Sequence, residues 1–162
     1  MPLSYWLTSL ESTSFATAIR ESTWLFPTIE SVHVLCIVLV VGSIMVVDLR
    51  LLNLASRARA VTELTAEVLP WTWIAFVCAA ATGGLLFSSS AVKYAQNTPF
   101  RIKMVLLLIA AINMAIFHLG IYRTVHHWDR APRIPFRARL GGAVSLVLWV
   151  AVVASGRWIG FV

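Results

Sequence analysis

The residues best suited to chemistry stand at the two ends of one apolar stretch, residues 30–50. Glu30 and His33 open this stretch, and Asp48 and Arg50 close it. Glu30 and His33 are three residues apart, a spacing that puts two side chains on one face of a helix. An ionisable group inside a membrane span is costly, roughly 2.5–3.5 kcal/mol at mid-helix, so each is a candidate site. The stretch therefore raises two hypotheses, one for each end.

The composition predicts an integral membrane protein. Hydrophobic residues make up 59% of the 162 residues and charged residues 12%, and the mean hydropathy is +0.83. Soluble domains carry about 25% charged residues, and a helix needs around 20 mostly apolar residues to cross a bilayer. We expect an all-α integral membrane protein, a single domain over residues 1–162 that forms a four-transmembrane-helix bundle. Its predicted spans cover residues 24–52, 69–87, 100–122 and 140–158.

Residues 3–20 differ from the spans because their apolar side chains follow helical spacing without forming a continuous apolar run. This pattern predicts an N-terminal interfacial amphipathic helix that lies on the membrane surface. Two similar segments, "TGGLLF" and "SGRWIGF", end the second and fourth spans. They indicate two parallel helical hairpins, a plan known in membrane proteins.

The basic residues predict the orientation. Five lie in segments on the side of the termini, whereas eight lie in the two loops on the other side. The loop with more Lys and Arg stays in the cytoplasm, so both termini are expected in the periplasm of a bacterial inner (plasma) membrane. The net charge of +6 is explained in this way, and no nucleic-acid partner is expected. The eight are Arg50, Arg57, Arg59, Arg123, Arg130, Arg133, Arg137 and Arg139.

Four polar residues are expected to converge near the outer surface: Glu30, His33, Lys103 and Arg157. The third span enters from that side and the fourth leaves there, which brings Lys103 and Arg157 to the depth of His33. Such an outer polar cluster could bind an anion, a proton, a metal ion or a cofactor propionate. The alternative interpretation is a set of interfacial salt bridges that closes the bundle.

Near the inner surface, Asp48 and His118 are expected at similar depth, where they could form a hydrogen-bonded pair. The alternative treats Asp48 as a helix-end residue and Arg50 as an arginine that snorkels to the headgroups. Asn113 lies in the middle of the third span and is expected to form an interhelical hydrogen bond.

A b-type haem is the first cofactor that these residues suggest, because small helical bundles often hold haem through axial histidines. His33 and His118 lie at opposite ends of the bundle, so one haem cannot use both. His33 could pair instead with Met104, with water, or with its copy in a dimer. Lys103 or Arg157 would then bind the propionates.

Copper is the second possibility. His33, Glu30 and Cys36 share a neighbourhood, and imidazole and thiolate ligands suit copper. Cys36 and Cys78 show no CxxC or other metal spacing, and their default interpretation is two small buried apolar side chains. No Ser-His-Asp, HExxH, GxSxG or phosphate-loop pattern is present, so haem is the one enzymatic route that the sequence offers.

Segments throughout the chain resemble an uncharacterised family of small bacterial four-span membrane proteins. They are "HVLCIVLVVGSIMVVDLRLL", "TGGLLF", "NTPFRIKMVLLLIAAIN" and "ARLGGAVSLVLWVAVVASGRWIGF". The resemblance covers nearly the whole chain and implies a fold and a bacterial inner membrane, but no reaction. The chain is also distantly similar to the membrane domain of CopD-type copper-resistance proteins and to small b-type cytochromes.

Together these observations predict a small inner-membrane subunit associated with redox or metal chemistry, binding b-type haem or copper near the periplasmic face. Its expected partners are the lipid bilayer and a periplasmic or membrane protein, and it is expected to act as an oligomer or as a subunit of a complex. The alternative is a non-catalytic accessory or scaffold subunit of a larger membrane complex.

Overall fold

The computed structural model describes residues 3–131 and 133–161, and every regular element in these residues is a helix. Four helices are long and apolar enough to cross a membrane. This confirms the predicted all-α bundle with four spans. The four are α3 (Leu25–Leu51), α4 (Val61–Ser89), α6 (Thr98–Leu119) and α7 (Phe136–Trp158).

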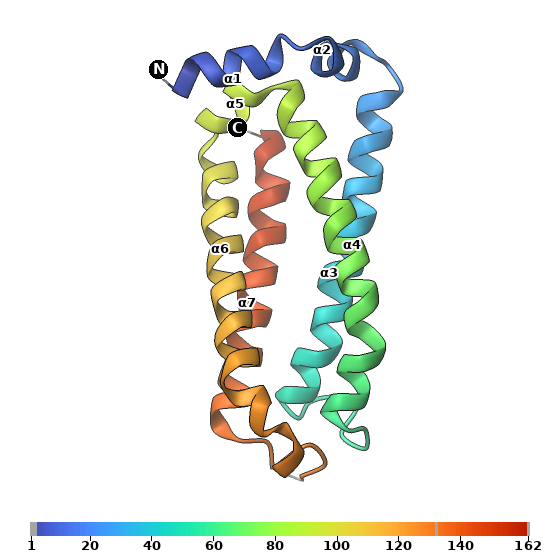
Figure 1. The fold of residues 1–162 in the computed structure, drawn as a ribbon, viewed down its shortest axis with the longest axis vertical. Helices are drawn as coiled ribbons and strands as arrows, with labels where there is room; N and C mark the ends of the chain where they lie inside the picture. The colour runs from blue at the N-terminus through green and yellow to red at the C-terminus, as the bar shows by residue number, and fades with distance from the viewer. Residues whose placement is uncertain (1–2, 132, 162) are drawn as a thin grey trace.

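The long helices form two antiparallel hairpins, α3 with α4 and α6 with α7, and α3 also packs against α7 (Figure 1). The first helix of each hairpin, α3 or α6, starts at the same end, so the hairpins run parallel, as the internal repeat indicated. The approach of α3 to α7 is close at Gly142, where an added Cβ would lie 3.1 Å from the Cβ of Leu51. The small residue therefore lets the two hairpins meet.

Both termini lie at one end of the bundle, which we call the termini end (Figure 1). Two helices, α1 (Leu3–Glu11) and α2 (Ser14–Glu21), lie across it beside the short helix α5 (Ala91–Gln96). The single helix predicted for residues 3–20 is therefore two. The break comes at Thr13, whose side chain accepts a hydrogen bond from the backbone of Ala16 and caps the second helix.

Two side chains of the N-terminal helices hold them to the bundle. The Glu11 carboxylate accepts a hydrogen bond of 2.9 Å from the backbone N–H of Val92. The Arg20 guanidinium donates to the backbone carbonyl of Ser89, at 3.3 Å. Both bonds satisfy backbone groups near the junction of α4 and α5, so α1 and α2 cover the place where the chain turns.

The opposite end, the loop end, carries residues 52–60, 120–131 and 133–135. It holds the main cluster of buried apolar side chains, and residues from both hairpins and from the second loop contribute to it. The helix α4 begins at Val61, eight residues before the predicted span, because a charged helical turn extends the apolar segment into this loop. The buried cluster consists of Leu51, Val61, Phe117, Val125, Trp128, Ile134 and Ala138.

The mid-span amide of Asn113 behaves as expected. Its side chain donates a hydrogen bond of 3.1 Å to the backbone carbonyl of Gly141, and so joins α6 to α7.

Candidate functional site

His33 is held in a defined orientation by α4. Its Nδ1 lies 3.0 Å from the carbonyl oxygen of Ala79 and 3.0 Å from the hydroxyl oxygen of Thr82. A carbonyl can only accept, so Nδ1 carries the hydrogen and donates it. The Thr82 hydroxyl itself donates to the carbonyl of Cys78, at 2.7 Å. In the neutral imidazole the lone pair is therefore on Nε2, the arrangement found in metal-ligating histidines.

Gly83 makes the space that the His33 ring occupies. An added Cβ at Gly83 would lie 3.0 Å from Cε1 and 3.5 Å from Nδ1 of His33. The ring therefore packs against bare backbone. The segment "TGGLLF" was the signal that could have located the groups holding His33, since it contains both Thr82 and Gly83.

Lys103 of α6 is the second polar residue at this level. It is half-buried, and its charge is close enough to act on the His33 imidazole. A Cβ added to Gly156 of α7 would lie 3.6 Å from the Lys103 amino nitrogen. The two ion pairs found in the described residues, Arg59–Glu67 and Arg130–Glu63, leave Lys103 without a carboxylate partner. Lys103 therefore places a positive charge between the hairpins, near His33.

The other two members of the predicted outer cluster lie apart from this pair. Glu30 is exposed and close to Tyr94 of α5, where burial and then the Glu30 charge raise the pKa of the phenol above its usual value. Arg157 is exposed, and its guanidinium stacks 4.8 Å from the ring centroid of Phe161. Of the four residues predicted for the outer cluster, His33 and Lys103 are therefore the two that lie close enough to interact.

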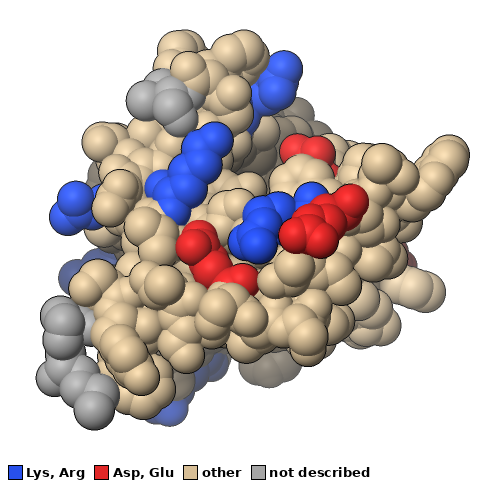
Figure 2. Space-filling view, turned by 90° about the horizontal axis from the view of Figure 1, so that it is seen from above, with Lys and Arg blue, Asp and Glu red and all other residues tan. Residues whose placement is uncertain are grey.

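Acidic and basic side chains also mix on the surface of the termini end. Seen from above, blue and red groups lie side by side near the middle of this face, surrounded by other residues (Figure 2). The face carries charges of both signs and no large area of one sign.

Met104 does not stand opposite His33. It is 50% exposed, on the outside of α6. Neighbouring residues on a helix point about 100° apart, so an inward Lys103 leaves Met104 facing outward. The predicted axial pair of His33 and Met104 therefore does not form within one chain.

The three ligands predicted for copper, which are His33, Glu30 and Cys36, do not gather into one site. In the part of the chain that the structure describes, no three His, Cys, Asp or Glu side chains gather closely enough to hold a metal ion. Glu30 is exposed, and it forms no such group with His33 and Cys36. One soft ligand pair is nevertheless present.

That pair is Cys36 of α3 and Cys78 of α4, both free thiols within hydrogen-bonding reach of each other. The register of the hairpin explains the contact. His33 faces Thr82, and ten residues further along α3 the Ser43 hydroxyl lies 2.8 Å from that of Thr72, ten residues earlier on α4. Cys36 is half-buried and Cys78 is exposed on the bundle surface, so the prediction of two separate buried side chains is wrong.

At the loop end, Asp48 is buried between α3 and α7, with 5% of its surface exposed. The hydroxyl of Ser145 on α7 is the polar group that faces its carboxylate. The predicted partner, His118, is engaged elsewhere. Its Nδ1 bonds to the Met114 carbonyl at 3.0 Å and its ring lies against Tyr122. The predicted Asp48–His118 pair is therefore replaced by contacts within α6 and between α3 and α7.

Arg50 is fully buried, so the interpretation of a snorkelling arginine is wrong. Its Nε donates to the carbonyl of Arg59 at 2.8 Å, and its Nη2 donates to the carbonyl of Asp129 at 3.3 Å. The side chain turns back under the two loops instead of reaching outward. Arg50 therefore ties the loop of the first hairpin to the loop of the second.

Asp129 strengthens the same junction. Its carboxylate accepts hydrogen bonds from the backbone N–H and the hydroxyl of Thr62, at 2.9 and 2.6 Å, and so caps the start of α4. Partial burial alone would raise the pKa of Asp129. The hydrogen bonds from Thr62 and Val61 and the charge of Arg130 outweigh it and hold that pKa below its usual range. The polar residues of the loop end thus hold the chain together.

The fold defines a small helical membrane protein with four spans in two hairpins. Residues 11–162 match a family described as a family of unknown function, DUF6644, and the chain belongs to this family. No curated protein and no solved structure matches. The resemblance to an uncharacterised family is confirmed, while the distant similarity to CopD-type domains and small b-type cytochromes stays a prediction.

Proposed function

We propose that this chain is a small membrane subunit associated with redox or metal chemistry, and that its cofactor-binding site contains His33 and Lys103. One observation carries the proposal: His33 donates through Nδ1 to α4, which leaves Nε2 as the ligand atom. Lys103 adds a positive charge at the same level, where an anionic group of a ligand would be stabilised. A half-buried ammonium gains most from such an anion, because water solvates it poorly there.

For haem b, His33 would be one axial ligand and Lys103 would hold a propionate. Within one chain Met104 does not supply the opposite ligand, so water or the His33 of a second copy would complete the iron. For copper, the ligands would come from His33 and from the thiols of Cys36 and Cys78, because imidazole and thiolate are groups that copper prefers. Each version makes the site at the termini end the functional one.

The orientation is part of this proposal. The eight arginines counted in the sequence lie at or beside the loop end, and the positive-inside rule then places that end in the cytoplasm of a bacterial inner membrane. The His33 site would face the periplasm, and its partner would be a periplasmic or membrane protein.

The test is a spectrum and a metal analysis of the protein purified in mild detergent. Haem would give a Soret band and a sharpened α band on reduction, and copper would be found by elemental analysis. His33→Ala should lose most of the cofactor, and Thr82→Ala should weaken binding by roughly 10-fold, because a ligand loses affinity when its hydrogen-bonding support is removed. The matched control is His127→Ala, an exposed histidine of the loop end.

A colourless protein without copper would overturn the cofactor proposal. Full cofactor content in His33→Ala would overturn the assignment of the ligand.

A second candidate is a non-catalytic accessory or scaffold subunit. It is favoured by the use that the chain makes of its charged side chains: Arg50, Arg20 and Glu11 each bond to the backbone of another segment. Co-purification of a membrane complex that is lost on deletion of the chain, yet kept with His33→Ala, would support this function over the first.

A further inference from the structure

Asp48 is an ionisable group buried by the protein itself. It lies three residues before the end of α3 and is 5% exposed, in a seam formed by α3 and α7. Because helices of the bundle cover it, its surroundings do not depend on where the headgroups of the bilayer lie. The surroundings are therefore set by the side chains that face it.

No counter-charge faces this carboxylate among the described residues. From α7 the facing group is the Ser145 hydroxyl, and no charged side chain of α4, α6 or α7 acts on Asp48. On α3 itself, Arg50 is two residues away, but its side chain bonds to the loop carbonyls of Arg59 and Asp129. One carboxylate oxygen, Oδ2, is enclosed and has no hydrogen-bond partner.

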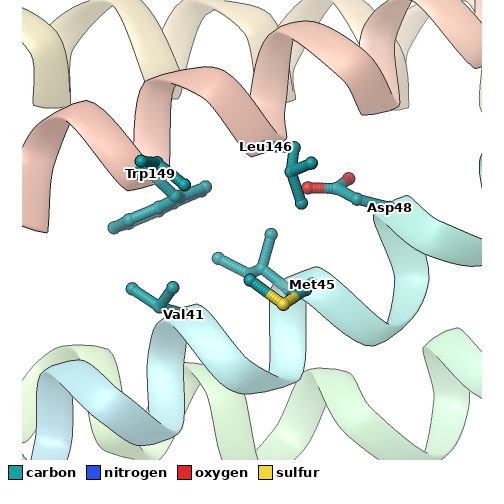
Figure 3. Close-up of a pocket in the computed structure, with 7 residues that line it drawn as sticks. Val41, Met45, Asp48, Leu146 and Trp149 are labelled. Atoms are coloured by element: carbon teal, nitrogen blue, oxygen red, sulfur yellow. The ribbon is translucent and has the colours of Figure 1, made fainter.

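A cavity of about 10 Å³ lies beside Asp48, between α3 and α7 (Figure 3). Its volume is that of about one water molecule, but a buried water needs two to four polar partners. Apart from the indole N–H of Trp149, the other lining side chains offer no strong hydrogen-bonding group, so a water beside Asp48 would have few polar partners. The other lining residues are Val41, Ile44, Met45, Leu146, Trp149 and Val150. Water in this cavity would therefore solvate an ionised carboxylate poorly.

The ionised and the neutral form of the carboxyl group differ in the free energy that it costs to bury them here. An ionised carboxylate with no cation and little water costs several kcal/mol to bury. A neutral carboxylic acid carries an O–H donor, and the Ser145 hydroxyl oxygen can accept from it. The neutral acid therefore removes the charge and gives the Asp48 carboxyl an O–H donor, for which the facing Ser145 hydroxyl is the available acceptor.

We propose that Asp48 and Ser145 form a proton-binding site in the seam between the two hairpins. The Asp48 carboxyl keeps the proton and donates a hydrogen bond through it to the Ser145 hydroxyl. This hydrogen bond links α3 to α7. Release of the proton to solvent leaves a carboxylate in the seam and weakens the contact between the hairpins. This site is separate from His33 and does not depend on a cofactor.

Infrared absorption of the purified protein tests the proton directly. At neutral pH we expect a carbonyl stretch of a protonated carboxyl group, and we expect Asp48→Asn to remove it. Asp129→Asn is the control, because the Asp129 carboxylate is hydrogen-bonded and ionised, and its replacement should leave the band unchanged. A band that survives Asp48→Asn, or no such band in the wild type, would overturn the proposal.

Ser145→Ala is a second variant that keeps Asp48 and changes little volume. It should shift the same band to higher frequency, because the acid loses its hydrogen-bond acceptor. An unshifted band would overturn the part assigned to Ser145, even if Asp48→Asn did not fold.

Thermal unfolding at several pH values tests the link between the proton and the seam. The folded protein keeps a proton on Asp48 at pH values where the unfolded chain has released it. The stability of the wild type should therefore fall as the pH rises above about 4, the ordinary value for an aspartate, and level off once the folded protein releases the proton too. Asp48→Asn should lack this part of the pH dependence. Equal pH dependence in both proteins, or recovery of stability at high pH with sodium but not choline chloride, would overturn the proton site, the latter in favour of a metal cation.

Discussion

The two ends of α3 carry similar sequence signals and have opposite surroundings. At the termini end, His33 is half-buried, its Nε2 has no hydrogen-bond partner among the described residues, and Lys103 nearby has no carboxylate partner. At the loop end, Asp48 and Arg50 are enclosed, and Arg50 bonds to two loops, although Asp48 Oδ2 and Arg50 Nη1 are left without a hydrogen-bond partner. The difference comes from what covers each end. Folded loops surround the side chains at one, while at the other α1 and α2 lie over the junction of α4 and α5.

The comparison teaches that an ionisable residue near the end of an apolar run has no fixed role. Where the surrounding chain takes up its hydrogen bonds, the residue stabilises the fold. Where a donor or acceptor remains on a half-exposed side chain, as at His33, the residue is available to a ligand. The following variants either break this contrast or sharpen it.

Arg50→Ala should have the largest effect. It removes a buried side chain and leaves the loop carbonyls of Arg59 and Asp129 without their donor, so we expect a loss of about 3–5 kcal/mol in unfolding free energy. Arg123→Ala, an exposed arginine of the loop end, should change it by less than about 0.5 kcal/mol. Thermal and denaturant unfolding in detergent measure both. Equal effects would mean that burial does not distinguish these arginines.

Gly83→Ala should have the second largest effect on stability, at the termini end of the bundle. The added Cβ would stand 3.0 Å from the His33 ring, so the ring must move, at a cost of about 1–3 kcal/mol and with loss of the hydrogen bond to Ala79. Gly84→Ala is the matched control, because no atom lies within 4 Å of its Cβ. Alanine is the better helix former, so the control should gain up to about 1 kcal/mol. The unfolding curves of the two variants should therefore move in opposite directions, and any cofactor content should fall in Gly83→Ala alone.

Asp129→Asn should have a smaller effect, about 1 kcal/mol, because it weakens the cap of α4 at Thr62. The pKa of Asp129 is lowered in the folded protein, so its contribution to stability is complete above the ordinary value of about 3.9 and is lost as the pH falls through the lower folded value. The difference in stability between wild type and variant should therefore shrink in acid. A difference that grows as the pH falls would contradict this cap.

Mild oxidation of the Cys36 and Cys78 thiols in membranes should have the smallest effect on stability. Its effect is measured by labelling the thiols with maleimide. Cys36 and Cys78 are neighbours, so both thiols should become unreactive to maleimide together as a disulfide forms within one chain. Cys78→Ala leaves Cys36 without a partner and should keep it reactive. A disulfide that joins two chains instead would contradict the register of α3 against α4.

Much of this protein was predictable from the sequence. The four spans follow from long apolar segments, since such segments must leave water and form helices in lipid. His33 and Lys103 were recognised because a charged or titratable residue is rare within a span. The placement of both termini at one end follows from an even number of spans, and Asn113 bonds between helices as a polar residue in lipid should.

The tertiary structure alone decided how the polar residues are used. The helix α3 is apolar on nearly every side, so its sequence does not indicate which face meets α4, α7 or lipid. That choice comes from close packing, which puts Cys36 beside Cys78, sets His33 against Gly83, and turns Arg50 under the loops. The sequence determines which segments enter the membrane because transfer from water depends on composition. Only packing determines which side chains meet, because that depends on the register and rotation of each helix against its neighbours.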